Sequence, residues 1–137
     1  MIVDVAQRTR VAGLIATNTT TERNPLITPA AEIQACGAGG LSGAPLRNRS
    51  TQTVAKLYLL TKGSMVLVGV GGIFTAQDAW EKICAGANLV QLYTGFIYQG
   101  PAIARDINDG LEQILHAAGP RSLADAVGCH AKGVAAL

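Results

Sequence analysis

Charged and aromatic side chains are scarce in this sequence of 137 residues, at 15% and 4% of the chain. The formal net charge is only +2, and no stretch clusters lysine or arginine with interleaved aromatic residues. Binding to nucleic acid leaves such a basic footprint, so we expect no nucleic-acid partner. Hydrophobic residues instead make up 49% of the chain. This excess is typical of strands that are covered on both faces.

Cysteine and histidine are few, and their spacing matches no common metal-binding motif. Cys36, Cys84 and Cys129 form no C-x-x-C pair, and His116 and His130 make no visible ligand set with them. We therefore expect free thiols, a reducing compartment and no metal site.

Long hydrophobic runs are also absent. A membrane-spanning helix needs a run of about 18 or more apolar residues, and the sequence has none. The first residues include the acidic Asp4 and lack a positively charged segment ahead of an apolar one. The sequence therefore predicts neither a signal peptide nor a membrane segment in this chain.

Three apolar segments each end in glycine or small polar residues, and they cover residues 14–20, 65–72 and 89–95. Strands of this kind present a ligand site at the carboxyl edge of a parallel barrel. The pattern predicts an α/β fold, namely half of a TIM (β/α)8 barrel with about three βα units and a parallel sheet. Because a closed barrel needs about 250 residues, we expect one partial domain over residues 1–137, truncated on its N-terminal side.

Helical spacing and capping residues lie around these strands. The expected helices cover residues 2–11, 50–62, 76–85 and 101–118. Thr75 and Asp78 have the spacing of a capping box for the third of them. Residues 22–49 are rich in proline and glycine, which predicts a long loop with one helical turn after Pro29. After Pro120, a short segment is expected to pack across the barrel end.

Two neighbouring strand ends carry groups that suit a phosphate. Gly71 and Gly72 directly precede a helix, where backbone N–H groups can approach an anion. Tyr93 and Thr94 end the next strand, and phosphate sites in barrels commonly join the loops after the last two strands. These residues predict a phosphate cradle. The alternatives are tight turns for the glycines and an ordinary packed aromatic for Tyr93.

The first strand end and the long loop offer further polar groups. Thr17, Asn18 and Thr19 can donate and accept hydrogen bonds at a planar heterocycle, or they can form a turn by bonding to their own backbone. Gly43, beside Ser42, allows close approach of the backbone to a ligand, or it belongs to a flexible lid. The sequence has no Ser-His-Asp set and no paired carboxylates, so we expect no residue for hydrolytic catalysis.

Four segments, at residues 16–20, 39–53, 68–101 and 122–128, resemble the C-terminal half of dihydroorotate dehydrogenase, in particular its class 2, quinone-linked group. The resemblance implies a TIM barrel that uses FMN to oxidise dihydroorotate to orotate in pyrimidine biosynthesis. Electrons would pass to a quinone, at the cytoplasmic side of a membrane. The residues that would contact FMN are Thr17, Gly43, Gly71, Gly72, Tyr93 and Thr94. Asn18 and Thr19 would hydrogen-bond the pyrimidine.

Other parts of the family pattern are missing from the sequence. The resemblance places the catalytic base, a serine, and the membrane-contacting helices in the first half of the protein. We therefore expect the chain to be inactive by itself, to hold FMN weakly, and to need the missing half. Two alternatives stay open: a non-catalytic, self-associating half barrel that binds only a phosphate-bearing ligand, and another FMN barrel that is an oxidoreductase of pyrimidines.

Overall fold

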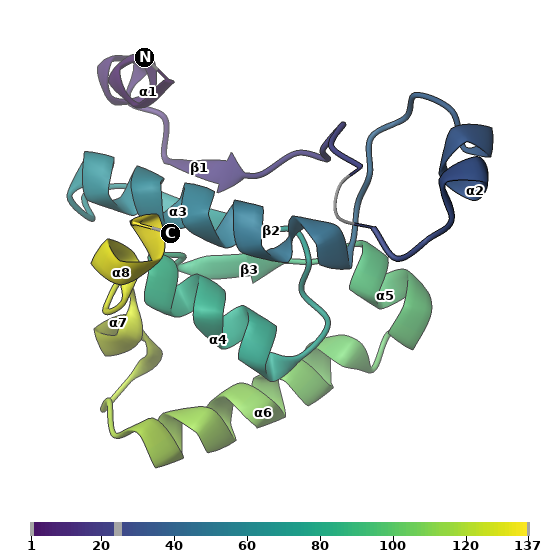
Figure 1. The fold of residues 1–137 in the computed structure, drawn as a ribbon. Coiled ribbons are helices and arrows are strands. Elements are labelled where there is room, and N and C mark those ends of the chain that lie inside the picture. Colours follow the sequence, from purple (N-terminus) through teal and green to yellow (C-terminus); the bar gives the residue numbers. More distant parts are fainter. Residues whose placement is uncertain (1, 24–25, 137) are drawn as a thin grey trace.

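The computed structural model describes residues 2–23 and 26–136 and contains a three-stranded parallel sheet in the order β1-β2-β3 (Figure 1). The strands are β1 (Gly13–Ala16), β2 (Val66–Val70) and β3 (Leu89–Gln91). In the register of the sheet, Ile15 lies beside Val68, and Val68 lies beside Leu89. The predicted parallel α/β arrangement is confirmed, and the carboxyl ends of all three strands lie at one edge.

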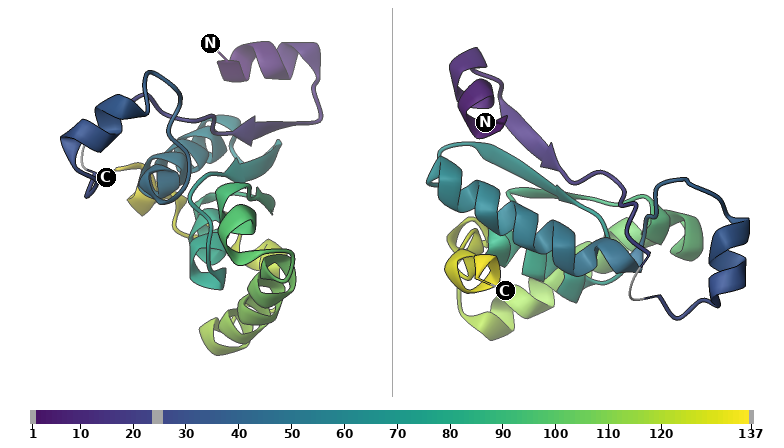
Figure 2. Two further views of the ribbon diagram at one scale, coloured as in Figure 1. Left: turned by 90° about the vertical axis from the view of Figure 1, so that its right-hand side faces the viewer. Right: turned by 45° about the horizontal axis from the view of Figure 1, so that its top comes forward.

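The other elements that the structure describes are helices and one 3-10 turn. They are α1 (Ile2–Thr9), α2 (Ala30–Ala35), η1 (Ala44–Leu46), α3 (Arg47–Thr61), α4 (Ala76–Ala85), α5 (Thr94–Gln99), α6 (Ile103–Ala118), α7 (Leu123–Ala126) and α8 (Ala131–Ala135). Helices α3 and α4 cover one face of the sheet, while α6 packs on α4 and α8 packs on α3 (Figure 1). Helix α1 lies at one edge beside β1, and α2 lies in the long loop (Figure 2).

The start of α4 follows its sequence closely. The Thr75 hydroxyl accepts a hydrogen bond from the Asp78 N–H at 3.2 Å, and the Asp78 carboxylate accepts one from the Thr75 N–H at 3.0 Å. Both halves of the predicted capping box are therefore present. Gly86 ends the helix with φ at +125°, as expected.

Two apolar clusters make up the core. One lies between α4 and α6 and includes Ile83, Ile107 and Leu111. The other lies between α3, the sheet and α8 and includes Val54 and Leu67. Both clusters lie on the helix-covered side of the sheet, so the molecule has a core on one face only.

The opposite face of the sheet is exposed. Ile15 and Leu89 are 68% and 61% exposed, and both are register partners of Val68. Val66 lies on the same face because side chains alternate along a strand, and it is 46% exposed. This apolar surface, formed by Ile15, Val66, Val68 and Leu89, is called the open face below.

Several expected boundaries are wrong. Helix α3 begins at Arg47 instead of Ser50, because η1 runs directly into it. Ser50 is buried inside the helix, where its hydroxyl donates to the Gly71 carbonyl at 3.0 Å and caps nothing. Strand β3 ends at Gln91 instead of residue 93, since Tyr93 leaves the extended conformation with ψ at −66° and α5 follows.

The two chain ends differ from expectation in smaller ways. Helix α1 ends at Thr9, two residues before the expected end, and α8 was not predicted. The turn expected after Pro29 is confirmed as α2. The segment after Pro120 packs on the helix layer instead of across the barrel end, because Ala126 is buried with the side chains between α4 and α6.

Candidate functional site

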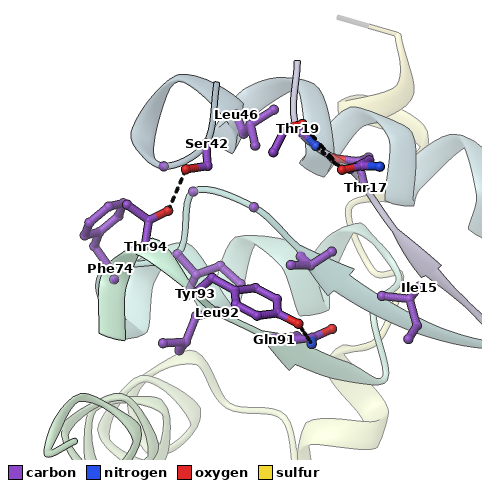
Figure 3. Close-up of a pocket in the computed structure, with 17 residues that line it drawn as sticks. Ile15, Thr17, Thr19, Ser42, Leu46, Phe74, Gln91, Leu92, Tyr93 and Thr94 are labelled. Carbon is purple, nitrogen blue, oxygen red and sulfur yellow. Dashed lines mark hydrogen bonds between the residues drawn. The ribbon is translucent and has the colours of Figure 1, made fainter. Parts of the chain in front are cut away.

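A cavity of about 510 Å³ lies at the carboxyl edge of the sheet (Figure 3). The loops that follow all three strands contribute to it, as does the end of the long loop. Every residue predicted for the cofactor and substrate sites lines this cavity: Thr17, Asn18, Thr19, Gly43, Gly71, Gly72, Tyr93 and Thr94. The sequence prediction therefore placed these residues together correctly, although the ligand that they bind remains a prediction.

Gly71 and Gly72 begin the loop from β2 to α4, and this loop packs against the start of α3. Their φ angles are +113° and +73°, a region that favours glycine. A Cβ atom at Gly72 would lie 2.5 Å from the backbone nitrogen of Arg47. The glycines are therefore needed for a turn against α3, as the alternative interpretation held, and the same turn also forms part of the cavity wall.

The tips of β2 and β3 lie against each other. A Cβ atom at Gly95 would lie 2.5 Å from the carbonyl oxygen of Ile73, so the loops after the two strands are in direct contact. Helix α5 starts here, and the N–H groups of its first turn have no partners inside the helix. Tyr93 provides no side-chain cap for them. The two tips thus converge as the phosphate-cradle prediction required.

Hydroxyl groups from separate segments meet beside these tips (Figure 3). The Thr94 hydroxyl donates to the Ser42 hydroxyl at 3.0 Å and so joins α5 to the long loop next to Gly43. The Tyr93 hydroxyl accepts a hydrogen bond from the Gln91 amide at 3.1 Å, while the ring remains 68% exposed. Tyr93 is therefore a surface residue of the cavity and is not packed in the core.

The end of β1 supplies the third wall. The Thr17 N–H donates to the Val70 carbonyl at 3.1 Å, which ties this segment to β2. The Thr17 hydroxyl is buried and has no hydrogen-bond partner within the described structure. The Asn18 side-chain oxygen accepts a hydrogen bond from the Thr19 N–H at 2.7 Å, as the turn interpretation predicted. Asn18 and Thr19 are both exposed and line the cavity, and the Thr19 hydroxyl also donates to the Asn18 side-chain oxygen at 3.4 Å.

The described part of the cavity wall carries many hydrogen-bond donors and no charged side chain. The residues that line it include threonine, serine, asparagine, glutamine and tyrosine, but no carboxylate, lysine, arginine or histidine. An anionic group in this cavity would therefore be held by neutral hydroxyl and backbone N–H donors, as in other phosphate-binding loops.

An ionic network of the buried Asp78 and Lys82 with the exposed Arg47 holds the loop after β2. Arg47 forms an ion pair with Asp78 at 2.5 Å, and Asp78 accepts a hydrogen bond from the Phe74 N–H at 3.0 Å. The Lys82 ammonium group donates to the Thr51 hydroxyl at 2.6 Å and to the Arg47 carbonyl at 3.1 Å. Sequence reasoning missed this network, since its partners are 31 and 35 residues apart in the chain.

The network shifts the pKa values of its members in the directions that burial and pairing dictate. Burial by itself raises the pKa of Asp78, but the hydrogen bonds from Phe74 and Thr75 and the charge of Arg47 outweigh it and hold the pKa below its usual value. Burial lowers the pKa of Lys82 to about 8, although the charges of Asp78 and Glu81 oppose this.

The expectation that His130 forms no ligand set with the cysteines is wrong. All three cysteines are free thiols, as predicted. However, the ligand atoms of Cys84, Cys129 and His130 lie within 4.8 Å of one another, because the turn between α7 and α8 folds back onto the end of α4. Burial, together with a hydrogen bond to Cys129, raises the pKa of the Cys84 thiol to about 12. The adjacent Cys129 and His130 were the one sequence signal that could have indicated this cluster.

Comparisons with known proteins agree with the fold. The dihydroorotate dehydrogenase family matches residues 1–115. Proteins named dihydroorotate dehydrogenase (quinone) are 52% identical over 127 residues in Rhodococcus erythropolis and 50% identical over 131 residues in Synechococcus elongatus. Each match covers 93% of this chain but only 36% and 35% of the relative. The chain therefore spans about a third of their length, less than the half expected from the sequence.

Solved structures give the same result. The crystal structure of ligand-free dihydroorotate dehydrogenase from Eimeria tenella matches with a TM-score of 0.85 and 42% sequence identity, over 93% of this chain and 35% of that one. A second structure from the same organism, in complex with ferulenol, has the same TM-score. The chain belongs to the dihydroorotate dehydrogenase family, and its three parallel strands form a portion of that family's TIM barrel.

Proposed function

We propose that this chain provides the flavin- and pyrimidine-contacting part of an FMN-dependent, quinone-linked dihydroorotate dehydrogenase in pyrimidine biosynthesis. The observation that carries the proposal is the convergence of the β2 and β3 tips on one uncharged, donor-rich cavity. The names of the most similar relatives support the substrate and the acceptor, since those relatives are quinone-linked enzymes.

The residues of the cavity fit an FMN group. Gly71, Gly72 and the first turn of α5 offer backbone N–H groups for the phosphate, and Thr94 adds a hydroxyl. Gly43 allows the long loop to approach the same group. The buried Thr17 hydroxyl has no protein partner and is available to a polar edge of the flavin ring.

Substrate binding is assigned to the outer wall. Asn18 and Thr19 are exposed at the cavity and offer an amide and a hydroxyl to the pyrimidine. FMN held by these residues would supply the two-electron redox chemistry that connects dihydroorotate oxidation to quinone reduction. The resemblance places the base that removes the substrate's proton, a serine, in the first half of the protein. That proton is therefore assigned to a base outside this chain.

Contact with the quinone membrane is likewise assigned outside this chain. Within residues 2–23 and 26–136, no helix has both the length and the hydropathy needed to cross a bilayer. The proposed peripheral location on the cytoplasmic side rests on the quinone acceptor named for the relatives.

A chimera tests the proposal. This chain would replace the matching third of the Rhodococcus erythropolis relative, and binding of FMN and of riboflavin, which lacks the phosphate, would be measured by flavin fluorescence. We expect dihydroorotate oxidation with quinone and clear preference for FMN. Loss of one hydrogen bond to a charged group costs about 1.5–3 kcal/mol. Thr94→Val should therefore weaken FMN binding by about tenfold to a hundredfold and leave riboflavin binding nearly unchanged.

Thr53→Val is the matched control, because the Thr53 hydroxyl donates to the Arg49 carbonyl within α3, away from the cavity lining. It should change neither affinity. A folded chimera that binds FMN and riboflavin equally, or binds inorganic phosphate but no flavin, would contradict the proposal. The second result would instead favour a chain that binds only a phosphate-bearing ligand.

A further inference from the structure

A second group of reactive side chains lies at the far end of α4 from the cavity. Thr75 caps the end of α4 near the cavity, whereas Cys84 lies in the last turn of the same helix. Cys129 and His130 lie in the turn between α7 and α8. The two sulfur atoms and a ring nitrogen of the imidazole are mutually within 4.8 Å.

The turn that carries Cys129 and His130 is fixed onto α4 by its backbone. The Gly128 N–H donates to the Ile83 carbonyl at 3.0 Å, and the His130 N–H donates to the Cys84 carbonyl at 2.9 Å. Both carbonyls belong to the last turn of α4, and the Ile83 carbonyl also accepts a hydrogen bond from the Gly86 N–H at 2.9 Å. The three side chains are therefore held together by the main chain.

Gly128 allows this close approach. Its φ angle is +78°, and a Cβ atom there would lie 2.2 Å from ring carbons of Tyr58. The turn is thus pressed against α3 as well as α4. Because two helices hold it, its position does not depend on contacts among the thiol and imidazole groups themselves.

The chemistry of the cluster is that of a soft-metal site. Two sulfurs and one imidazole nitrogen are the donor set that favours Zn²⁺ and similar thiophilic ions over Mg²⁺ or Ca²⁺. In a tetrahedral site with Zn–S bonds of about 2.3 Å, two sulfurs lie about 3.8 Å apart. The observed atoms already lie within 4.8 Å, so a shift of about 1 Å completes that geometry.

A groove beside the cluster gives access to it. The groove has a volume of about 470 Å³, and its lining includes Cys84, His130, Glu81 and Trp80. Cys84 is 1% exposed, so a metal ion would reach its sulfur from this side. Three protein ligands with one side facing a groove leave a coordination position for water or another small ligand.

We propose that Cys84, Cys129 and His130 bind a thiophilic divalent cation of the Zn²⁺ type, with the fourth coordination position facing the groove. Bound there, the ion links the C-terminal end of α4 to the α7–α8 turn. It lies at the opposite end of α4 from the proposed flavin cavity, so it adds a metal link to a turn that the main chain already positions and takes no part in flavin binding. The proposal is independent of the proposed function.

The test uses Co²⁺ as a spectroscopic probe in place of Zn²⁺. The reduced, chelator-treated chain is titrated anaerobically with Co²⁺, and thiolate-to-cobalt charge-transfer absorption and native mass are recorded. We expect one equivalent to bind, with absorption typical of tetrahedral thiolate coordination, and Zn²⁺ to displace it. Even partners outside the coordination sphere affect metal affinity by 10- to 100-fold, so Cys129→Ser and His130→Gln should each weaken binding by about a hundredfold or more.

Matched controls come from the same chain. Cys36 and His116 are the exposed cysteine and histidine outside the cluster, so Cys36→Ser and His116→Gln should leave the titration unchanged. Absence of the charge-transfer band, or equal binding by Cys129→Ser and the unmodified chain, would overturn the proposal. Formation of a Cys84–Cys129 disulfide in air by a chain that binds no Co²⁺ would also overturn it and identify a thiol pair.

The same titration in the chimera separates this site from the flavin cavity. It also covers the case in which the isolated chain folds poorly. Thr94→Val should weaken FMN binding there and leave Co²⁺ binding intact, whereas Cys129→Ser should do the reverse. A chimera that folds and binds flavin but takes up no Co²⁺ would refute the metal site and leave the proposed function standing.

Discussion

At the scale of single residues, two glycines with nearly the same φ angle have very different surroundings. Gly72 and Gly37 have φ angles of +73° and +72°. A Cβ atom at Gly72 would lie 2.5 Å from the backbone of Arg47, but nothing lies within 4 Å of one at Gly37. The left-handed conformation costs an L-residue about 1–2 kcal/mol. We therefore expect Gly37→Ala to lower the free energy of unfolding by about 1 kcal/mol.

Gly72→Ala should lower the free energy of unfolding more, because the added methyl group would contact backbone atoms, which cannot rotate away as a side chain can. Overpacking adds about 1–3 kcal/mol to the conformational cost, which gives a total of about 3 kcal/mol. Urea unfolding of the two variants measures the difference directly. Equal losses for both would show that the loop after β2 is not held against α3, and the cavity wall described above would be wrong.

The buried hydroxyl of Thr17 gives a prediction with an unusual sign. Because this hydroxyl has no partner in the described structure, no hydrogen bond offsets the free-energy cost of burying it. Thr17→Val should raise the free energy of unfolding of the flavin-free protein by about 1 kcal/mol and weaken FMN binding in the chimera. Thermal unfolding with and without FMN tests both effects.

Thr20 is the control for this change, since it is also buried but its hydroxyl is satisfied. It accepts hydrogen bonds from the Glu22 N–H and from Arg49, both at 3.1 Å. Thr20→Val should therefore destabilise the protein by about 1–3 kcal/mol. If both valine variants are destabilised to the same degree, the Thr17 hydroxyl has a hydrogen-bond partner in solution and is not left free for a ligand.

At the scale of elements, Asp78 stabilises the start of α4 and joins it to α3. Its carboxylate completes the capping box with Thr75 and pairs with Arg47, and its pKa lies below the usual value. A carboxyl whose pKa is lower in the folded state stabilises the fold above its unfolded pKa of about 3.9. This contribution is lost as the pH falls through the folded pKa.

Asp78→Asn should therefore lower the unfolding free energy by about 2–4 kcal/mol at pH 7, and the loss should shrink as the pH falls below about 4. Urea midpoints between pH 2 and pH 7 measure the change. Asp109→Asn, on the exposed side of α6, is the control and should shift the midpoints little at any pH. A loss for Asp78→Asn that is constant with pH would mean that the charge of the carboxylate contributes nothing.

The same helices show which parts of the fold the sequence could predict. The Thr75 and Asp78 spacing predicted the start of α4 correctly, because a capping box depends on residues three apart. The predicted start of α3 was wrong because the true start depends on contacts between residues that are distant in sequence. Ser50 has the residue type of a cap, but the Gly71 carbonyl, 21 residues away, is its partner. Propensity alone does not distinguish the two.

The site residues divide in the same way. Seven of the eight cavity residues could be predicted together because the carboxyl ends of neighbouring parallel strands always share one edge. Gly43 lies in the long loop, and only the resemblance assigned it to the same site. No such rule brings Cys84 to Cys129. They meet only because the α7–α8 turn bonds to the carbonyls at the end of α4. Clusters that depend on the return of a C-terminal segment need the tertiary structure.

At the scale of the whole molecule, the sheet is covered on one face only. Parallel sheets almost always have both faces covered. Here α3 and α4 cover one side, while the open face, formed by Ile15, Val66, Val68 and Leu89, stays accessible (Figure 1). Both outer strands of the sheet also offer backbone groups that another strand could pair with. A chain with this surface should bury it against another protein segment or against a second copy of itself.

We therefore expect the isolated chain to self-associate and to retain little flavin. Light scattering after gel filtration should give a mass above the 14.1 kDa of one chain. Leu89→Lys places a charge on the open face and should shift the population toward the monomer, because burying an unpaired ammonium opposes association. Ile27→Lys is the control, since Ile27 is fully exposed in the long loop, and it should leave the mass unchanged.

The chimera should neither self-associate through the open face nor release flavin if the rest of the barrel covers that face. A yellow, catalytically active monomer of this chain alone would contradict the prediction, because it would mean that three strands with one uncovered face suffice for the fold and for the flavin.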